Sequence, residues 1–140
     1  MGKLYFFLYD AKTKDDLPYW DAFPLVFPIR KYKDGFLGIN LHYLDYGMRS
    51  QLMAALFTLI DNPNLTEDSR LKLSYSILNR AKKYKLFKPC IKRYLSGHFR
   101  SSFYKIPPEE WTYAMLMPRE QFQKASKYTV WEESKSKINV

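Results

Sequence analysis

The sequence has few of the residues from which many catalytic and metal sites are built. Its 140 residues include one cysteine, two histidines and five scattered glycines. The single Cys90 excludes an intrachain disulfide framework and suits a reducing cytosol, and the chain has too few cysteines and histidines for a common structural zinc site. Gly35 and Gly38 fall in a predicted hairpin and form no phosphate-binding loop between a strand and a helix. We therefore expect no metal and no cofactor.

Long hydrophobic runs are also lacking. No apolar stretch approaches the roughly 18 residues that a membrane span requires. The run from Leu4 to Tyr9 is shorter than the core of a signal peptide and lacks a small-residue cleavage site, so we expect a strand there. The sequence therefore predicts no contact with a membrane.

Positive charge and aromatic rings are abundant instead. Lysine and arginine number 23 against 14 acidic residues, which gives a net charge of +9. Aromatic residues make up 18% of the chain, more than a core of this size hides completely, so some should lie at a surface that meets a partner. This balance favours a polyanion or an acidic protein over a small-molecule substrate.

The basic charge is concentrated between residues 70 and 108, where eleven basic residues and no acidic one are interleaved with tyrosines and phenylalanines. Lysine and arginine bind phosphates, while aromatic rings stack on exposed bases. Two other interpretations stay open: a solvated basic helix face with its rings in the core, and a contact with an acidic protein. The residues predicted to contact nucleic acid are Arg80, Lys82, Lys83, Lys88, Lys92, Arg93 and Arg100.

The order of elements predicts an α+β fold, with a small antiparallel sheet or an SH3-like barrel that carries a two-helix insertion and a C-terminal helix. The strongest signal is a hairpin from Leu25 to Leu44, whose apolar residues alternate on either side of an Asp34-Gly35 turn. Pro28 removes an amide donor, so the first strand should lie at an edge or carry a bulge.

Helical spacing from Met48 to Ile60 predicts an amphipathic helix, and a second helix should run from Thr66 to about Lys85. Further predictions are one or two helical turns at 90–95, extended segments at 102–106 and 112–117, and a helix over about 122–132. We expect one domain over 1–140, divided into N-terminal strands and hairpin (1–47), a helical insertion (48–96), returning strands and helix (97–132) and a polar tail (133–140).

No motif predicts an enzyme. Glu133-Ser134-Lys135 has the Glu-x-Lys spacing of some metal-dependent nucleases, but it lies in the polar tail, whereas those enzymes carry it on a core strand. His42 is expected to form hydrogen bonds at a surface or groove, and the role of His98 stays open. We expect no catalytic residue.

Three segments carry a resemblance to a known group of proteins. They are Leu17-Pro18-Tyr19-Trp20-Asp21-Ala22-Phe23-Pro24-Leu25-Val26, Gly35-Phe36-Leu37-Gly38-Ile39-Asn40-Leu41-His42-Tyr43-Leu44 and Thr129-Val130-Trp131-Glu132-Glu133-Ser134. The chain resembles small virion-associated proteins of T4-like contractile-tailed bacteriophages, of the head-completion or DNA-end-protector type. A neck, tail or baseplate subunit stays open as an alternative.

The resemblance implies a late structural protein of the virion, present in the host cytoplasm during assembly. Its expected partners are other virion proteins, with double-stranded DNA ends as a further candidate. The residues predicted to dock a protein neighbour are Tyr19, Trp20, Phe23, Phe27 and Tyr43. The alternative function is a tail or baseplate subunit that makes no DNA contact.

Overall fold

The computed structural model describes residues 3–12, 14–60 and 85–138. The strands are β1 (Leu4–Phe6), β2 (Trp20–Asp21), β3 (Leu25–Tyr32), β4 (Gly35–Asn40), β5 (Ile91–Leu95), β6 (Tyr104–Ile106) and β7 (Phe122–Gln123). The helices are α1 (Tyr46–Ile60), α3 (Trp111–Leu116) and α4 (Lys127–Ile138), with short 3-10 helices η1 (Leu41–Tyr43), η2 (Lys85–Cys90), η3 (Ser96–His98) and η4 (Pro108–Glu110). The predicted α+β class is confirmed.

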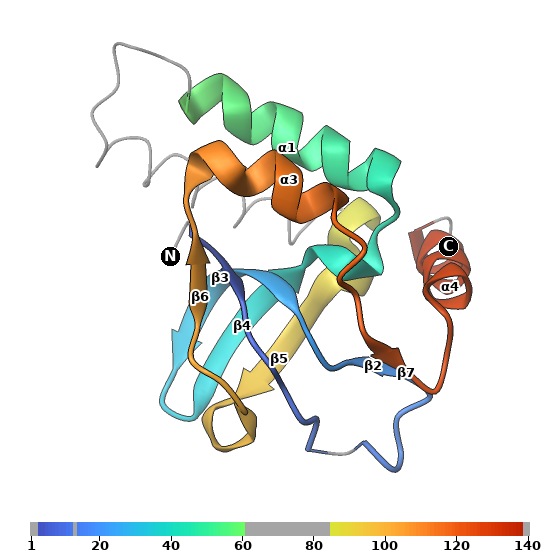
Figure 1. Cartoon of the computed structure of the whole chain (residues 1–140). Coiled ribbons are helices and arrows are strands. Elements are labelled where there is room, and N and C mark those ends of the chain that lie inside the picture. The colour runs from blue at the N-terminus through green and yellow to red at the C-terminus, as the bar shows by residue number, and fades with distance from the viewer. Residues whose placement is uncertain (1–2, 13, 61–84, 139–140) are drawn as a thin grey trace.

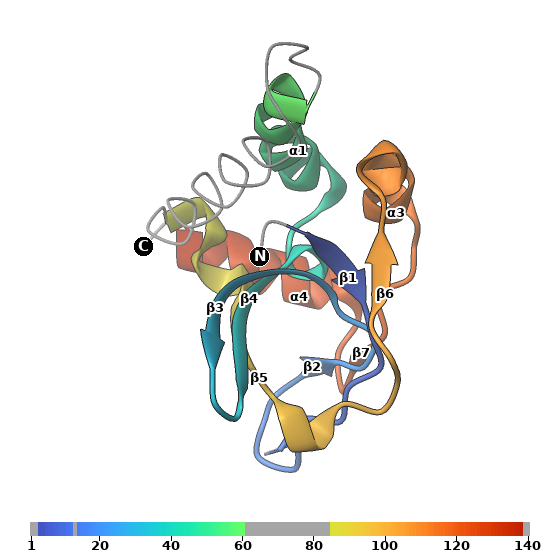
Figure 2. The ribbon, with the colours of Figure 1, turned by 90° about the vertical axis from the view of Figure 1, so that its left-hand side faces the viewer.

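Five strands form one antiparallel sheet in the order β5-β4-β3-β1-β6, and β2 pairs with β7 separately. Helices α1 and α3 lie next to each other over one side of this sheet, and α4 lies beyond the β2–β7 pair (Figure 1). Figure 2 shows the large sheet bent into an arc, with β3, β4 and β5 on one side and β1 and β6 on the other. The first strand, β1, thus pairs in this sheet with β6, which follows it by about a hundred residues.

The predicted hairpin is confirmed as β3 and β4. Its loop is one residue earlier than expected, because Tyr32 already pairs with Gly35. Gly35 has φ of +151°, and a Cβ there would lie 1.8 Å from the carbonyl oxygen of Tyr94, so no other residue fits without a shift of the backbone. The register shifts between Pro28 and Arg30, which is the bulge that the proline predicted.

Apolar side chains cover both faces of the sheet. The larger core cluster includes Leu4, Leu25, Phe27 and Ile39 and extends to the helices. A smaller cluster on the other face contains Phe7, Tyr9, Val26 and Tyr94. Phe7 packs edge-on against several rings there.

Three local predictions were wrong. Residues 91–95 form strand β5, which pairs with β4, and not a helical turn. Residues 112–117 were expected to be extended, but residues 111–116 form helix α3. The indole of Trp111 in this helix donates a 2.8 Å hydrogen bond to the carbonyl of Ile106 and packs on Phe27. The tail from 133 is helical to Ile138, and α4 begins only at Lys127, after Ser126 caps the amide of Thr129.

The helix predicted over 48–60 is confirmed and begins two residues earlier, where the carboxylate of Asp45 accepts a 3.0 Å hydrogen bond from the amide of Met48. The second predicted helix, from Thr66 to about Lys85, lies outside the described residues. The extended segment at 102–106 is confirmed in part as β6, which pairs with β1.

Arg49 joins the helices to the sheet. It has no exposed surface, and its guanidinium donates to the carbonyl oxygens of Leu41 and Leu44 at 2.8 Å and of Met115 at 2.7 Å. Its Nη2 also lies 3.5 Å from the buried carboxylate of Glu120. One side chain therefore satisfies backbone groups in η1, in the following turn and in α3.

Candidate functional site

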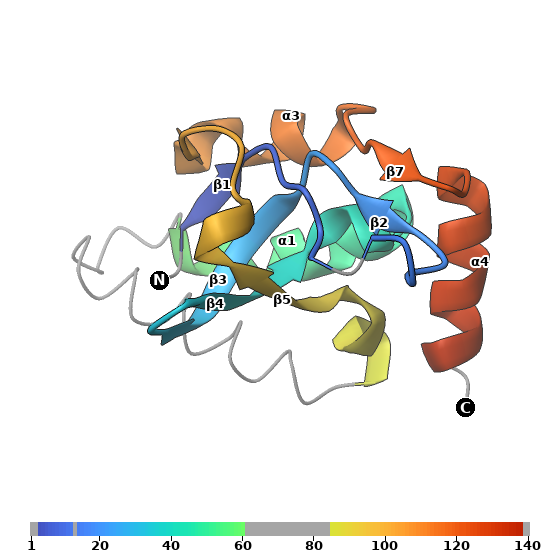
Figure 3. The same ribbon diagram turned by 90° about the horizontal axis from the view of Figure 1, so that it is seen from below.

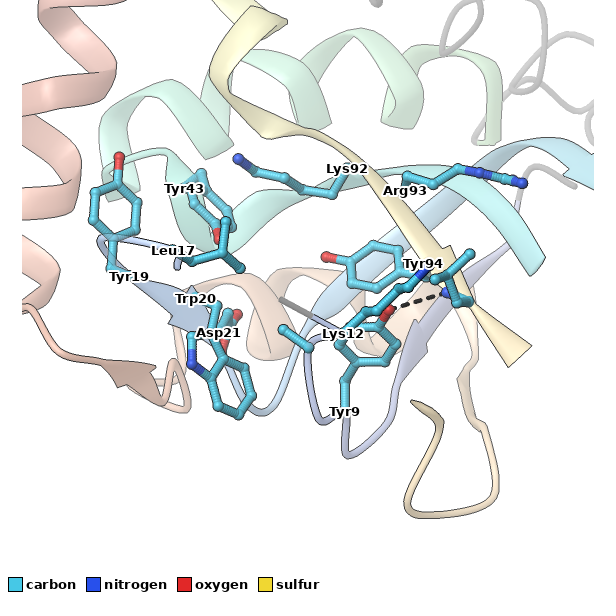
Figure 4. Close-up of a pocket in the computed structure, with 12 residues that line it drawn as sticks. Tyr9, Lys12, Leu17, Tyr19, Trp20, Asp21, Tyr43, Lys92, Arg93 and Tyr94 are labelled. Carbon is cyan, nitrogen blue, oxygen red and sulfur yellow. Dashed lines mark hydrogen bonds between the residues drawn. The ribbon is translucent and has the colours of Figure 1, made fainter. Parts of the chain in front are cut away.

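A pocket of about 320 Å³ opens between β5 and the N-terminal segment that ends in β2. Figure 3 shows β5 and β2 facing each other on the side of the molecule away from α1. Figure 4 shows its side chains, which come from segments far apart in the sequence. The lining residues are Tyr9, Ala11, Lys12, Leu17, Tyr19, Trp20, Asp21, Tyr43, Lys92, Arg93, Tyr94 and Leu95.

The backbone holds the two walls in place. Tyr9 pairs with Phe99 in an isolated antiparallel bridge, and the amide of Asp10 donates a 3.0 Å hydrogen bond to the carbonyl of His98. The hydroxyl of Tyr9 accepts a 3.0 Å hydrogen bond from the amide of Leu95 (Figure 4). The wall that contains Tyr9 is therefore fixed to the end of β5.

Five of the twelve lining residues are aromatic: Tyr9, Tyr19, Trp20, Tyr43 and Tyr94. Tyr9 and Tyr94 meet edge-on with centroids 4.9 Å apart, and Tyr19 lies 6.2 Å from Tyr43. Burial raises the pKa of Tyr43 and Tyr94 well above the ordinary value, and burial and a hydrogen bond to Glu133 raise the pKa of Tyr19 to about 12. All three phenols are neutral at physiological pH. Of the five rings only that of Trp20 is more than marginally exposed.

Lys92 is the cation inside this lining. Alternation along β5 sends its side chain and that of Tyr94 to the pocket side, whereas the guanidinium of Arg93 points away (Figure 4). The Nζ of Lys92 lies 4.1 Å from the ring centroid of Tyr43. Burial, and then the nearby charge of Lys137, lowers the pKa of Lys92 to about 8. Among the described residues no carboxylate forms an ion pair with it.

A buried polar group lies beneath the pocket. The carboxylate of Asp21 receives hydrogen bonds from the amides of Phe23 and Gln121 at 3.0 and 3.1 Å and from the Asn40 side chain at 3.0 Å, and it lies 2.7 Å from Nδ1 of His42. Burial alone would raise the pKa of Asp21, but His42 and these donors lower it overall. The negative charge of Asp21 is therefore already compensated.

His42 has no exposed surface, which corrects the prediction of a surface or groove residue. Its Nε2 is buried and has no hydrogen-bond partner among the described residues. Because the ring is closed off, it cannot contact a group bound in the pocket. The Asp21–His42 pair supports the walls instead.

Four of the seven cations predicted to contact nucleic acid fall within the described residues. Lys88 is exposed, and Lys92 lies in the pocket. Arg93 forms an ion pair with Asp34 and stacks 3.8 Å from the ring centroid of Tyr32, and Arg100 lies 3.5 Å from a carboxylate oxygen of Asp10. The other three, Arg80, Lys82 and Lys83, lie outside the described residues.

The five aromatic residues predicted to dock a protein are mostly covered by the chain itself. Phe27 has no exposed surface, and Tyr43 and Tyr19 are 4% and 8% exposed. Phe27 therefore belongs to the core, where it packs on a tryptophan, and cannot serve as a docking residue. Phe23 and Trp20 are half-buried, with Phe23 stacked on Phe6.

Three residues that line the pocket were not predicted as site residues: Tyr9, Lys12 and Tyr94. The only local signal was weak, because Ile-Lys-Arg-Tyr-Leu at 91–95 contains residues common in strands but no regular alternation of apolar and polar positions. It could not reveal that Tyr9, 85 residues earlier than Tyr94 in the chain, packs on that strand.

Neither a metal site nor a membrane span is found in the described ranges. Residues 3–12, 14–60 and 85–138 bring together no group of three or more histidine, cysteine or acidic side chains that could hold a metal ion. No helix in that part of the chain is both long and apolar enough to cross a bilayer. Glu133 and Lys135, of the nuclease-like spacing, are exposed on α4, and Lys135 forms a 3.1 Å ion pair with Asp45.

The fold and the pocket define a small α+β protein with a basic, ring-lined cavity beside an edge strand. Residues 1–136 match the model of the phage T4 terminal DNA protecting protein family, and the chain belongs to that family. No curated protein and no solved structure matches the chain. The family match confirms the resemblance to a T4-like DNA end protector and supports a DNA-end-associated phage protein.

Proposed function

We propose that this protein binds the ends of linear double-stranded DNA and shields them without chemical conversion. The observation that carries the proposal is the family match over residues 1–136, because that family is described as protecting terminal DNA. The net charge of +9 supplies the long-range attraction to phosphate. As a late phage protein it would act in the virion and, during assembly, in the host cytoplasm.

The contact surface in this proposal is the basic stretch together with the pocket. The cations assigned to phosphate are Arg80, Lys82, Lys83, Lys88, Lys92, Arg93 and Arg100. Each phosphate contact releases condensed counterions, so affinity should fall steeply as salt rises. No element of the described chain presents a recognition helix for base edges, so binding should depend on the presence of an end more than on its sequence.

The test compares one duplex in two forms, linear with two open ends and closed at both ends by hairpin loops. We expect tighter binding of the linear form, and protection of that form from an added exonuclease. Equal affinity for both forms would overturn end binding.

A charge-reversal variant tests the basic stretch. The triple change Lys82→Glu, Lys83→Glu and Arg93→Glu should abolish binding at moderate salt. A matched control reverses three exposed cations outside the basic stretch, Lys31, Lys33 and Arg119, for the same change in net charge. Unchanged DNA retention by the first variant, or equal loss in both, would rule the stretch out.

A second candidate function is that of a tail or baseplate subunit without DNA contact. It is favoured by exposed apolar side chains near β6 and α3: Phe103, Tyr104, Tyr113 and Leu116 are 43%, 76%, 74% and 50% exposed. Such a patch typically meets a protein neighbour. A fixed copy number in DNA-free tails would favour this function, whereas presence only in DNA-filled heads would favour end binding.

A further inference from the structure

We propose that the pocket receives one terminal nucleotide of a DNA strand, with its phosphate monoester on Lys92 and its base against Trp20. This inference rests on the proposed function and identifies the part of the DNA end that the site holds. It adds a specific contact to the general attraction of the basic stretch.

The position of Lys92 is the first argument. Lys92 is half-buried, and its ammonium group lies 4.1 Å from the ring centroid of Tyr43. The charged group that acts on it most strongly in the described chain is another cation, Lys137 of α4. A phosphate would thus supply the negative charge that no described neighbour supplies.

The carboxylates around the pocket are already engaged. Asp21 accepts from amides and side chains on all sides, and Asp34 pairs with Arg93. Asp10 is held by Lys14 at 3.1 Å and by Arg100 at 3.5 Å. Each of these three acids therefore already has a partner other than Lys92.

The size of the cavity is the second argument. A volume of about 320 Å³ lies at the lower end of the range for small-molecule sites, which suits a single nucleotide and excludes a duplex. The terminal base pair frays more easily than an internal one, so only an end can place a nucleotide there at low cost. A terminal phosphate monoester also carries about −1.5 to −2 charge, more than an internal phosphodiester.

The lining supplies the contact for the base. Trp20 is the half-buried ring of the lining and offers the most exposed aromatic surface for stacking, whereas Tyr19, Tyr43 and Tyr94 are 8%, 4% and 4% exposed. Stacking on an aromatic ring does not distinguish the four bases. The pocket should therefore accept any terminal base.

The experiment uses the full-length protein and a DNA hairpin with one open end. That end carries a 5′-phosphate, a 3′-phosphate or hydroxyls only, and affinity is measured by titration with the quenching of tryptophan fluorescence as a second signal. Trp111 and Trp131 are buried, at 2% and 8% exposure, so quenching should come from Trp20 and disappear in Trp20→Phe. We expect one phosphorylated end to bind about tenfold tighter or more than the hydroxyl end.

The variant Lys92→Met should lose this preference for phosphate, while the matched control Lys31→Met, at an exposed lysine of β3, should keep it. Equal affinity for phosphorylated and hydroxyl ends in the unaltered protein, or an undiminished preference in Lys92→Met, would overturn the pocket assignment. In either case a linear duplex that still binds better than a closed one would leave the proposed function standing. Free thymidine monophosphate that binds in a Lys92-dependent way, with no phosphate preference at DNA ends, would also overturn the assignment.

Discussion

Replacing Lys92 with methionine should make the protein more stable, although it removes a charge from the proposed binding site. Burial lowers the pKa of this lysine from 10.5 to about 8, which corresponds to a cost of about 3 kcal/mol for holding the charged form in the folded state. Methionine has a similar length and carries no charge. The variant loses the cation–π contact with Tyr43, worth about 1–2 kcal/mol when desolvated.

We therefore expect the free energy of unfolding of Lys92→Met to exceed that of the unaltered protein by about 1–2 kcal/mol at pH 7. Urea unfolding followed by circular dichroism measures this difference. The pH dependence gives a second readout. Between about pH 8 and 10 the unfolded chain binds a proton at Lys92 that the folded chain has released, so the contribution of Lys92 to the free energy of unfolding should become less unfavourable as the pH rises in this window.

Two other groups that face Lys92 also have shifted pKa values. Burial raises the pKa of Cys90 on η2 to about 12 and also raises the pKa of Tyr43 on η1, so each of them makes stability fall as the pH rises past its ordinary value. Both proteins share these two groups and the cation Lys137 of α4, so their contributions cancel in the comparison. The stability advantage of Lys92→Met should therefore shrink from pH 8 to 10. A variant less stable than the unaltered protein at pH 7, or with an advantage that does not change with pH, would refute the reasoning.

Three further predictions concern the framework of the fold. Arg49→Met should cost about 3–5 kcal/mol in urea unfolding, because it leaves the buried carbonyl oxygens of Leu44 and Met115 without their side-chain donor and removes one of two cations beside the Glu120 carboxylate; a loss below about 1 kcal/mol would contradict this. Gly35→Ala should cost more than about 2 kcal/mol, whereas Gly97→Ala, where a Cβ meets nothing within 4 Å, should be close to neutral. The lowered pKa of Asp21 should make stability fall as the pH drops below about 4. In the Asp21→Asn variant, the melting temperature should depend less on pH in this acid range.

The hairpin and the first helix could be predicted from the sequence because their signals are local. Alternating apolar residues on either side of the turn at Gly35, and the missing amide of Pro28, determine the β3–β4 pair with its bulge. The periodicity from Met48 likewise describes α1. In each case the residues that determine the element lie within it.

The elements that were missed are determined by distant contacts. Strand β5 is short and follows Pro89, and its pairing partner β4 lies more than fifty residues earlier in the chain. Helix α3 contains residues that are common in strands, but Trp111 is anchored on Ile106 and packs on Phe27, so tertiary contact overrides propensity. The pocket depends on such contacts too, since Tyr9, Trp20 and Lys92 meet only in the folded chain.

The structure also separates cations that the sequence could only count. Arg93 and Arg100 each have an acidic partner, Asp34 and Asp10, so the positive field at these arginines is partly cancelled before any phosphate arrives. For a phosphate to use either arginine fully, an existing ion pair must open, and exposed pairs of this kind contribute only about 0–1 kcal/mol. A phosphate that binds Lys92 has no ion pair to open. The free-energy cost of burying the charged ammonium group is already present in the folded state, and a bound phosphate would reduce it. The stability that Lys92→Met gains and the affinity that it loses should therefore have the same electrostatic origin.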